Sequence, residues 1–414
     1  MRTQFICLAL VLVLLCPTLS AQWVETNGPY GGDILCLAVS GTNLFAGTLG
    51  SGVFLSTDNG KSWSAVDSGL TIVSVNALVV SDAHLFAGTA VGIFLSTDNG
   101  KSWTPANTGI PDFPTFLRSV NTFAVFGTNI FVGTRGRMYV STNYGESWTA
   151  VDTSLTVPPV SAFAAIGTNI FAGTYGSGMF RSTNSGASWT AIKNGLPTTE
   201  VWTLAVNGMN LFAGTGNGVY LTMNDGTSWN AVNSGLTDTT VSALAMADTS
   251  LFAGTRGGVF VRNNNDTSWS AVNKGLTNLV VDALAVMPVS GPPDSAFLFA
   301  ATRGGGVWIR PLSEMITSVG LSSAGMPTQF RLEQNYPNPF NPTTTIRYAL
   351  PHKSTVQLTV YNAVGQQVVL LVQGEQEAGY YDVKFDGSRL ASGVYFYRIQ
   401  AGNFVQTRKL LLLR

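Results

Sequence analysis

The sequence has few charges, few histidines and few cysteines for its length. Only 11% of the 414 residues are charged, the 22 basic side chains balance the 22 acidic ones, and there are two histidines. A chain without net charge has no electrostatic footprint for nucleic acid or for an anionic membrane surface, so neither is expected as a partner. No apolar run approaches the roughly 20 residues that a membrane-spanning helix needs.

Cysteine is scarce and unevenly placed. Two of the three cysteines lie in residues 1–21, where a basic residue, an apolar run from Phe5 to Leu15 and the small residue Ala21 are typical of a cleaved signal peptide. The mature chain is therefore expected to begin near residue 22 and to keep only Cys36, which excludes an internal disulfide. A membrane anchor is the alternative, disfavoured by the short run; a lipoprotein cysteine at Cys16 is disfavoured by the bulky residue before it.

Glycine and aromatic residues are abundant, with 45 glycines and 11% aromatics. This composition suits short strands joined by tight turns and predicts an all-β fold. A phrase close to Leu-Phe-Ala-Gly-Thr occurs seven times, at steps of 40 to 47 residues. The phenylalanines of the seven copies are Phe45, Phe86, Phe131, Phe171, Phe212, Phe252 and Phe299. Four short strands in each period are typical of the blades of a β-propeller.

The two ends of the repeat region predict a closed ring. The seventh repeat has three strands, the last ending near Arg310, and no tryptophan-containing fourth strand follows it. The segment Gln22-Trp23-Val24-Glu25 carries the tryptophan that the fourth strands share. If it pairs with the last repeat, residues 22–311 form a seven-bladed propeller closed by its N-terminal strand, without open edges. An open, six-bladed alternative leaves Trp23 without a role.

A hairpin motif joins the third and fourth strands of the repeats. Its first copy, residues 56–63, reads Ser-Thr-Asp-Asn-Gly-Lys-Ser-Trp, and Asn replaces the Asp in the third to fifth copies. The short acceptor is expected to cap backbone amides, the glycine to supply a positive φ and the tryptophan to pack between blades. The sixth copy, Arg262 to Trp269, has Asp266 in place of the glycine, so a looser turn is expected. The structural residues of the other copies are Asp58, Gly60, Trp63, Asp98, Gly100, Trp103, Asn143, Trp148, Asn184, Trp189, Asn224 and Trp229.

Ser-x-Asp-x-Gly-x-x-Trp resembles the Asp-box, or BNR, repeat of sialidase-like propellers. It is also similar to the repeats of photosystem II assembly factors and sortilin-type propellers. The resemblance implies a fold rather than a chemistry, because in those families the box is a folding element placed away from the catalytic face. Calcium binding or carboxylate catalysis at Asp58 and Asp98 is the minor alternative.

The predicted propeller has few side chains that could act in catalysis, which disfavours an enzyme. A sialidase needs an arginine cluster, a tyrosine activated by a glutamate and an acidic proton donor. Between residues 22 and 310 the glutamates are Glu25, Glu146 and Glu200, of which only Glu200 is expected to face the mouth of the ring. His84 is the one histidine there, so paired metal ligands are lacking. The sequence predicts no catalytic residue, no metal site and no cofactor.

One face of the ring is a candidate binding surface. The loop after the second strand should lie opposite the hairpin motif, and four repeats carry Arg or Tyr there. Three further residues should reach the same rim. The candidates are Arg118, Arg135, Tyr175, Glu200, Trp202, Arg256 and Arg303. Arginine and aromatic side chains together suit an acidic sugar or a peptide; the alternative is that they are solvated loop residues.

A different pattern begins after Pro311. Residues 312–329 are rich in Ser, Gly and Thr and predict a linker, and residues 330–414 alternate in about seven strands, which fits a small Ig-like β-sandwich. Three phrases resemble the type A C-terminal sorting domain of type IX secretion cargo. They are Tyr336-Pro337-Asn338-Pro339-Phe340-Asn341-Pro342, Val360-Tyr361-Asn362-Ala363-Val364-Gly365 and Leu390-Ala391-Ser392-Gly393-Val394-Tyr395.

This resemblance implies a partner and a location. The type IX secretion machinery, found in Bacteroidota and Chlorobi-type bacteria, would recognise the tail and deliver the chain through the periplasm to the cell surface or the extracellular space. Two functional hypotheses remain open. The favoured one is a binding or structural module for an extracellular protein or glycan; its rival is a sialidase-like glycoside hydrolase or lyase on the same propeller.

Overall fold

The computed structural model describes residues 22–29, 33–112, 115–151, 159–192, 194–263, 266–287, 296–320, 329–335, 338 and 340–412. The proposed signal peptide, residues 1–21, lies outside them. The chain divides into two compact units, residues 1–318 and 319–414. Within the described residues, no helix is both long and apolar enough to cross a membrane.

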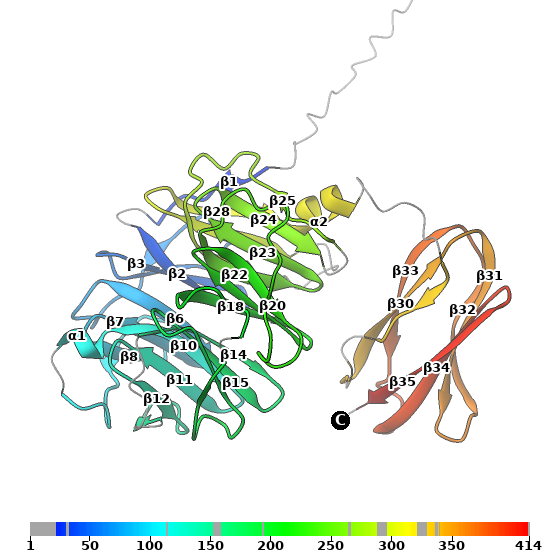
Figure 1. The fold of residues 1–414 in the computed structure, drawn as a ribbon, viewed down its shortest axis with the longest axis horizontal. Helices are drawn as coiled ribbons and strands as arrows, with labels where there is room; N and C mark the ends of the chain where they lie inside the picture. The colour runs from blue at the N-terminus through cyan, green and yellow to red at the C-terminus, as the bar shows by residue number, and fades with distance from the viewer. Residues whose placement is uncertain are drawn as a thin grey trace, which may run out of the picture. The chain divides into compact units, whose positions relative to one another are not determined.

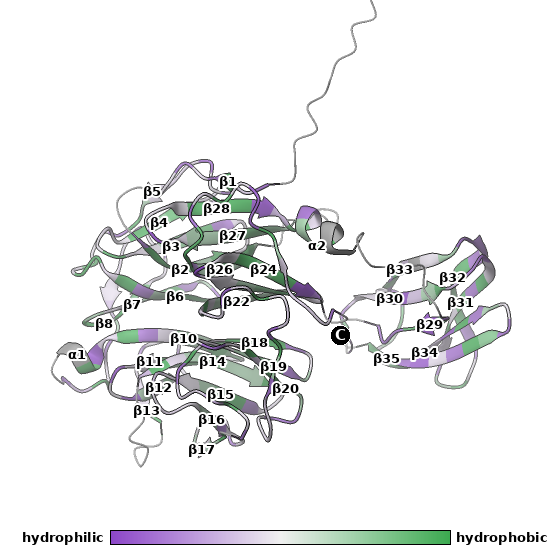
Figure 2. Ribbon diagram, turned by 45° about the horizontal axis from the view of Figure 1, so that its top comes forward, coloured by the Kyte–Doolittle hydropathy of each residue, from purple (hydrophilic) through white to green (hydrophobic). Residues whose placement is uncertain are grey.

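The first unit consists of seven four-stranded antiparallel sheets in the described residues. Numbered by chain order, sheets 1 to 6 each contain four consecutive strands, from β2–β5 to β22–β25, and sheet 7 contains β26, β27, β28 and β1. In Figure 1 the first strands β2, β6, β10, β14, β18 and β22 gather at the middle of the unit. The short fourth strands β5, β13 and β17 lie at its periphery (Figure 2).

Equivalent strands of the seven sheets have nearly equal lengths. The first strands are β2 Ile34–Ser40, β6 Val75–Ser81, β10 Val120–Phe126, β14 Val160–Ile166, β18 Val201–Asn207, β22 Val241–Ala247 and β26 Val281–Met287. The second are β3 Asn43–Thr48, β7 His84–Thr89, β11 Asn129–Thr134, β15 Asn169–Thr174, β19 Asn210–Thr215, β23 Ser250–Thr255 and β27 Phe297–Thr302. The third are β4 Val53–Ser56, β8 Gly92–Ser96, β12 Met138–Ser141, β16 Met179–Ser182, β20 Gly218–Thr222, β24 Gly258–Asn263 and β28 Gly306–Pro311. The fourth are β5 Ser64–Ala65, β9 Thr104–Pro105, β13 Thr149–Ala150, β17 Thr190–Ala191, β21 Asn230–Ala231, β25 Ser270–Ala271 and β1 Val24–Glu25.

The N-terminal segment completes sheet 7, as the sequence predicted. Val24 and Glu25 of β1 pair with Ile309 and Trp308 of β28. Each first strand contacts the first strand of the next sheet, and β26 of sheet 7 contacts β2 of sheet 1. The contacts between sheets therefore form a closed circle. A core cluster also bridges the two ends of the repeat region, with Phe299 of sheet 7 packed near Leu44 of sheet 1.

The recurring phrase is explained by contacts between sheets. Phe45 is buried in a cluster with Phe94 and Trp103 of sheet 2. A Cβ on Gly47 would lie 2.8 Å from a methyl of Val75 in the next first strand, so glycine allows the sheets to approach closely. The hydroxyl of Thr48 donates to the carbonyl of Gly52 at 2.9 Å and closes the turn before β4. The same threonine bond recurs in every sheet.

The segment expected to be a linker is helical in its first half. Helix α2 spans Leu312–Gly320, and its Leu312 and Met315 are buried. The Arg310 Nε atom lies 3.6 Å from the Glu314 carboxylate in the first turn of the helix. Leu312 and Met315 are three positions apart and therefore lie on one face of the helix. The many serines and threonines around them hid this pattern in the sequence. Residues 321–328 lie outside the described part.

The second unit has seven strands in two sheets among its described residues. One sheet has the order β29-β30-β33 and the other β32-β31-β34-β35. Their inner faces share one apolar core that includes Ile346, Tyr348, Leu358 and Tyr397. The bounds are β29 Arg331–Leu332, β30 Thr343–Leu350, β31 Ser354–Asn362, β32 Gln367–Gln376, β33 Gly379–Asp386, β34 Gly393–Ala401 and β35 Phe404–Leu412.

Candidate functional site

The first strands of the seven sheets surround a common cavity. Its volume is about 380 Å³, and each first strand contributes three consecutive residues to the lining. The lining residues are 35–37, 76–78, 121–123, 161–163, 202–204, 242–244 and 282–284. Apart from Asp282, none of these side chains carries a charge at neutral pH. The cavity is therefore a mostly neutral channel with one carboxylate.

A β-bulge occurs at the second residue of every first strand. The pairing with the second strand shifts there in all seven sheets. A bulge redirects a side chain out of the regular alternation. The seven bulged residues all line the cavity, and they differ most among the repeats: Leu35, Asn76, Asn121, Ser161, Trp202, Ser242 and Asp282. We call these seven residues the bulge ring.

The loops that follow the second strands lie beside the starts of the first strands. The backbone amide of Arg135 donates to the carbonyl of Ser119, and that of Tyr175 to Pro159, each at 2.9 Å. The amide of Arg303 donates likewise to Val280 at 2.9 Å. Three of the predicted site residues are thus held near the bulge ring, each within its own sheet.

An ion pair joins this loop to the bulge ring in sheet 7. Arg303 makes two contacts with the Asp282 carboxylate, Nε to Oδ2 at 3.1 Å and Nη2 to Oδ1 at 2.6 Å. These hydrogen bonds and the charge of Asp282 raise the pKa of Arg303, and Asp33 adds to the effect. The arginine side chain remains 54% exposed, whereas that of Asp282 is 12% exposed. Sequence reasoning missed Asp282 and Asp33 because it searched for glutamates.

The other predicted residues have separate surroundings. Arg118 forms an ion pair with Asp112 at 2.5 Å, at the end of α1 (Thr115–Arg118). Arg135 and Arg256 are exposed, and no ion pair joins either to another residue of the described ranges. Tyr175 is 54% exposed, and its backbone forms an isolated bridge with Glu200.

Trp202 is the largest member of the bulge ring. Its indole Nε1 atom is buried and has no hydrogen-bond partner among the described residues. A buried indole N–H usually finds an acceptor. Trp202 therefore contributes its aromatic ring to the lining of the channel, while its indole N–H is buried and unpaired.

Cys36 also lines the channel, one residue after the bulge in sheet 1. Burial raises the pKa of its thiol to about 12, although a backbone hydrogen bond from Gly47 opposes the rise. Only a thiolate is an effective nucleophile or metal ligand. At neutral pH this cysteine is a packing residue. In the described residues, no three His, Cys, Asp or Glu side chains gather to hold a metal ion.

The hairpin motifs form a closed local network. The Asp58 Oδ1 atom accepts the Ser62 amide at 2.9 Å, and the Ser62 hydroxyl donates to Oδ2 at 2.6 Å. The Ser56 hydroxyl oxygen accepts the Gly60 amide at 2.7 Å. Asp98 repeats these bonds. Asn143, Asn184 and Asn224 accept the equivalent backbone amide through Oδ1, but their Nδ2 groups donate to the serine hydroxyl oxygen rather than accept from it. Every carboxylate or amide in these boxes is occupied by its own turn.

The tryptophans of the boxes link consecutive sheets. The Trp103 Nε1 atom of sheet 2 donates to the Val66 carbonyl of sheet 1 at 2.7 Å. Trp148, Trp269 and Trp23 make the equivalent bond to the preceding sheet. The Trp189 Nε1 atom instead donates to the Gly186 carbonyl of its own turn at 3.0 Å.

The pKa of Asp58, like that of Asp98, is lowered to about 2, mainly by the hydroxyl and amide of Ser62 or Ser102. Because the folded pKa lies below the unfolded value of about 3.9, this stabilisation is present above pH 4 and is lost as the pH falls towards 2. An Asp58→Asn, Asp98→Asn double variant should match the wild type at pH 7, since Asn143 fills the same role. Thermal melts at pH 7, 4, 3 and 2 should show a smaller acid-induced decrease in Tm for the variant. Equal decreases in both proteins would contradict this assignment.

Comparisons with known proteins agree with these two units. Residues 334–413 match the family described as secretion system C-terminal sorting domain, and residues 54–65 match the BNR/Asp-box repeat. A search of curated proteins finds no match. At the low identities of the structural matches, the likeness concerns the fold alone.

Three solved structures illustrate this likeness. The extracellular domain of a putative hybrid two-component system from B. thetaiotaomicron is 16% identical, with a TM-score of 0.57, and the match covers 80% of this chain and 46% of that one. An ancestral GH74 enzyme is 18% identical, with a TM-score of 0.55 and coverage of 92% and 59%. YCF48 bound to D1 peptide is 15% identical, with a TM-score of 0.53 and coverage of 70% and 96%. The chain thus combines an all-β, propeller-like unit bearing a BNR/Asp-box repeat with a type IX secretion C-terminal sorting domain, which directs it to the cell surface or the extracellular space.

Proposed function

We propose that the chain is a secreted binding module. Residues 1–21 are its signal peptide, residues 22–311 a seven-bladed β-propeller closed by β1, residues 312–329 the connection, and residues 330–414 an Ig-like sorting domain. The circular contacts from β2 to β26 and the pairing of β1 with β28 support the seven-bladed ring. The two sheets around one core support the sandwich.

The ligand is an extracellular peptide or glycan bound at the mouth of the channel. The observation that carries this proposal is the bulge ring: seven equivalent positions differ in chemistry while the scaffold around them repeats. Trp202 supplies an aromatic surface, and the Asp282–Arg303 pair supplies charge. Tyr175, Arg135 and Arg256 add exposed aromatic and cationic groups. Aromatic and arginine side chains are the usual anchors of such recognition. YCF48, a protein of similar fold, is bound to D1 peptide.

The test is a screen of glycan and peptide arrays with the purified protein, followed by titration of the best ligand. Replacing Arg256 and Arg303 with alanine should weaken binding by about tenfold or more, as expected for the loss of two charged contacts. The melting temperature should change little, because the side chain of Arg303 is half-exposed and its ion pair is therefore weak. Arg303→Ala alone also leaves the Asp282 carboxylate without its partner. An Arg303→Ala, Asp282→Asn variant removes that charge as well, so any remaining loss of affinity comes from the missing contact between Arg303 and the ligand.

The control is Arg398→Ala, which removes an exposed arginine from the sorting domain. It should bind the ligand like the wild type. If the Arg256→Ala, Arg303→Ala protein also binds unchanged, the mouth is not the site.

A glycoside hydrolase is the second candidate. Asp33 and Asp282 both act on Arg303, so two carboxylates lie at the mouth, and the similar structures include GH74 enzymes. Two carboxyl groups are the usual catalytic pair of such enzymes. This hypothesis requires release of reducing ends from a polysaccharide panel and loss of that activity in Asp282→Asn. Binding without hydrolysis would favour the first proposal.

A further inference from the structure

The seam between sheets 5 and 6 differs from the other seams of the ring. In the other sheets that have an Asp-box, the glycine of its turn packs against a residue of the preceding sheet. A Cβ on Gly145 would lie 2.4 Å from the ring of Phe86, and one on Gly186 would lie 2.7 Å from the ring of Phe131. In sheets 3 and 4 the turn glycine thus covers a phenylalanine of the preceding sheet's second strand. The turn glycines of the other three boxes, Gly60, Gly100 and Gly226, instead face Thr26, Val66 and Ile192.

Sheet 6 has lost this turn. Arg262 stands where the other boxes have Ser or Thr, and Asp266 stands where they have glycine. The Asp266 carboxylate now accepts the backbone amide of Asn263 at 3.1 Å and its side-chain amide at 2.9 Å. Arg262 Nε donates to the Asp266 carbonyl at 3.0 Å. Because Asp266 replaces the turn glycine, the glycine-to-phenylalanine contact of sheets 3 and 4 has no counterpart at Phe212.

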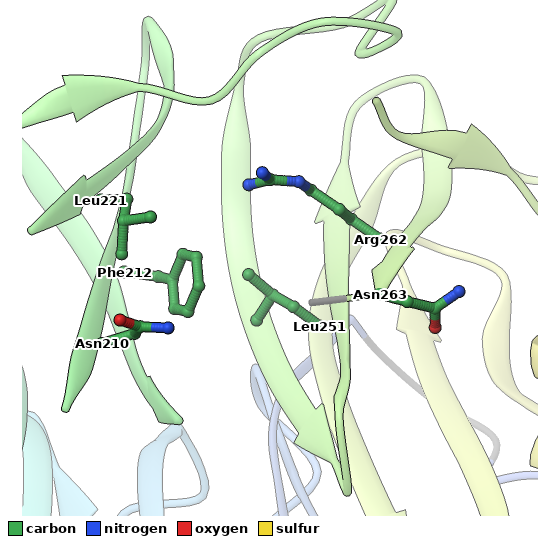
Figure 3. A pocket seen from close by; sticks show the side chains of 6 residues that line it. All are labelled: Asn210, Phe212, Leu221, Leu251, Arg262 and Asn263. Atoms are coloured by element: carbon green, nitrogen blue, oxygen red, sulfur yellow. The ribbon is translucent and has the colours of Figure 1, made fainter. Parts of the chain in front are cut away.

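A cavity of about 40 Å³ occupies this seam. Figure 3 shows Phe212 and Leu221 of sheet 5 on one side and Leu251 of sheet 6 on the other. The side chain of Arg262 points from β24 toward the strands of sheet 5, whereas that of Asn263 points away from them (Figure 3). The cavity therefore has an apolar floor and a cationic edge.

The two terminal nitrogens of the Arg262 guanidinium make no hydrogen bond to a described residue, so their N–H groups can donate to a ligand. Its Nε–H is used within the turn, and within the described ranges no carboxylate lies at ion-pair distance from its terminal nitrogens. Partial burial lowers the pKa of Arg262, which reflects the cost of removing its charge from water, and the charge of Asp266 offsets this lowering only in part. An anion in the cavity would offset this cost through a two-pronged contact.

We propose that this seam is a binding site for a short-chain monocarboxylate such as acetate or propionate. A water needs about 10–15 Å³, so the cavity has room for about three waters, close to the size of such an anion. One guanidinium balances one negative charge, and Phe212, Leu221 and Leu251 accommodate a short alkyl group. Sulfate or phosphate, which carries more charge and no apolar part, matches this lining less well.

The site is tested by titrating the full chain with ¹³C-labelled acetate and following line broadening by NMR. Acetate should bind saturably, propionate should compete, and sulfate at equal ionic strength should not. Arg262→Met should weaken acetate binding by about tenfold or more, as expected for loss of a charge-assisted pair. Arg137→Met, which removes an exposed arginine of sheet 3, should bind acetate like the wild type.

A second variant tests the proposal independently, in case Arg262→Met does not fold. Arg262→Ser, Asp266→Gly restores the Asp-box pattern of the other sheets, so it should fill the seam, raise the Tm and abolish acetate binding. Saturable acetate binding that survives in both Arg262 variants would overturn the proposal. So would the absence of saturable binding to the wild type, or equal competition by sulfate.

Discussion

Replacing Trp23 with alanine should destabilise the first unit by about 3–5 kcal/mol, the usual cost of truncating a buried tryptophan. Trp23 is 1% exposed, and its indole donates to the Val272 carbonyl at 2.6 Å. Its backbone amide donates to Lys274 at 2.8 Å. The residue thus ties the N-terminal strand of sheet 7 to sheet 6, and its loss weakens the closure of the ring.

Urea denaturation followed by circular dichroism measures this effect. Val24→Ala is the matched control, because Val24 is the next residue along the chain and is 53% exposed. It should cost no more than a few tenths of a kcal/mol, as other surface substitutions do. Coincident denaturation midpoints for the two variants would show that the N-terminal strand does not secure the ring.

Replacing Gly109 with alanine should have the next largest effect. Gly109 has a φ of 88°, and a Cβ there would lie 2.1 Å from the carbonyl oxygen of Trp148 in the next sheet. The added methyl must push the backbones of sheets 2 and 3 apart. The expected loss is about 3 kcal/mol or more, because strain in φ and a backbone clash act together.

Gly127→Ala separates the two causes. Gly127 has a φ of 63°, but a Cβ there would meet nothing within 4 Å. It should cost only the conformational strain, about 1 kcal/mol. Denaturant titrations of both variants test the difference. Equal losses would mean that the approach of the Trp148 backbone to Gly109 has no energetic role.

Much of the candidate site was visible in the sequence, but its chemical centre was not. The loop residues Arg135, Tyr175 and Arg303 follow a repeated phrase, so their common location could be predicted from the period. Asp282 was overlooked because the search for acidic groups considered only glutamates, and this aspartate was read as an ordinary residue of a first strand. Its counterpart Trp202 was predicted to reach the rim from its place at the start of a first strand. Comparing that one position across all seven repeats would have revealed the bulge ring.

The glycine before each Leu or Ile in the loop after the fourth strand was also missed. Gly69, Gly195, Gly235 and Gly275 share the geometry of Gly109. The recurrence was present in the sequence, but a turn explained it adequately. Only the packed structure shows that the next tryptophan backbone passes directly over each of these glycines.

The sequence by itself determined the local features of this protein. Its repeat period set the strand pattern, its short acceptors and glycines set the hairpin turns, and its C-terminal phrases marked the sorting domain, because each depends on residues close together in the chain. Tertiary structure alone decided which side chains meet. The pairing of Asp282 with Arg303, the seam beside Arg262 and the burial of helix α2 depend on how distant segments pack. The distances between such side chains are set by the arrangement of all the sheets, and no local sequence pattern encodes them.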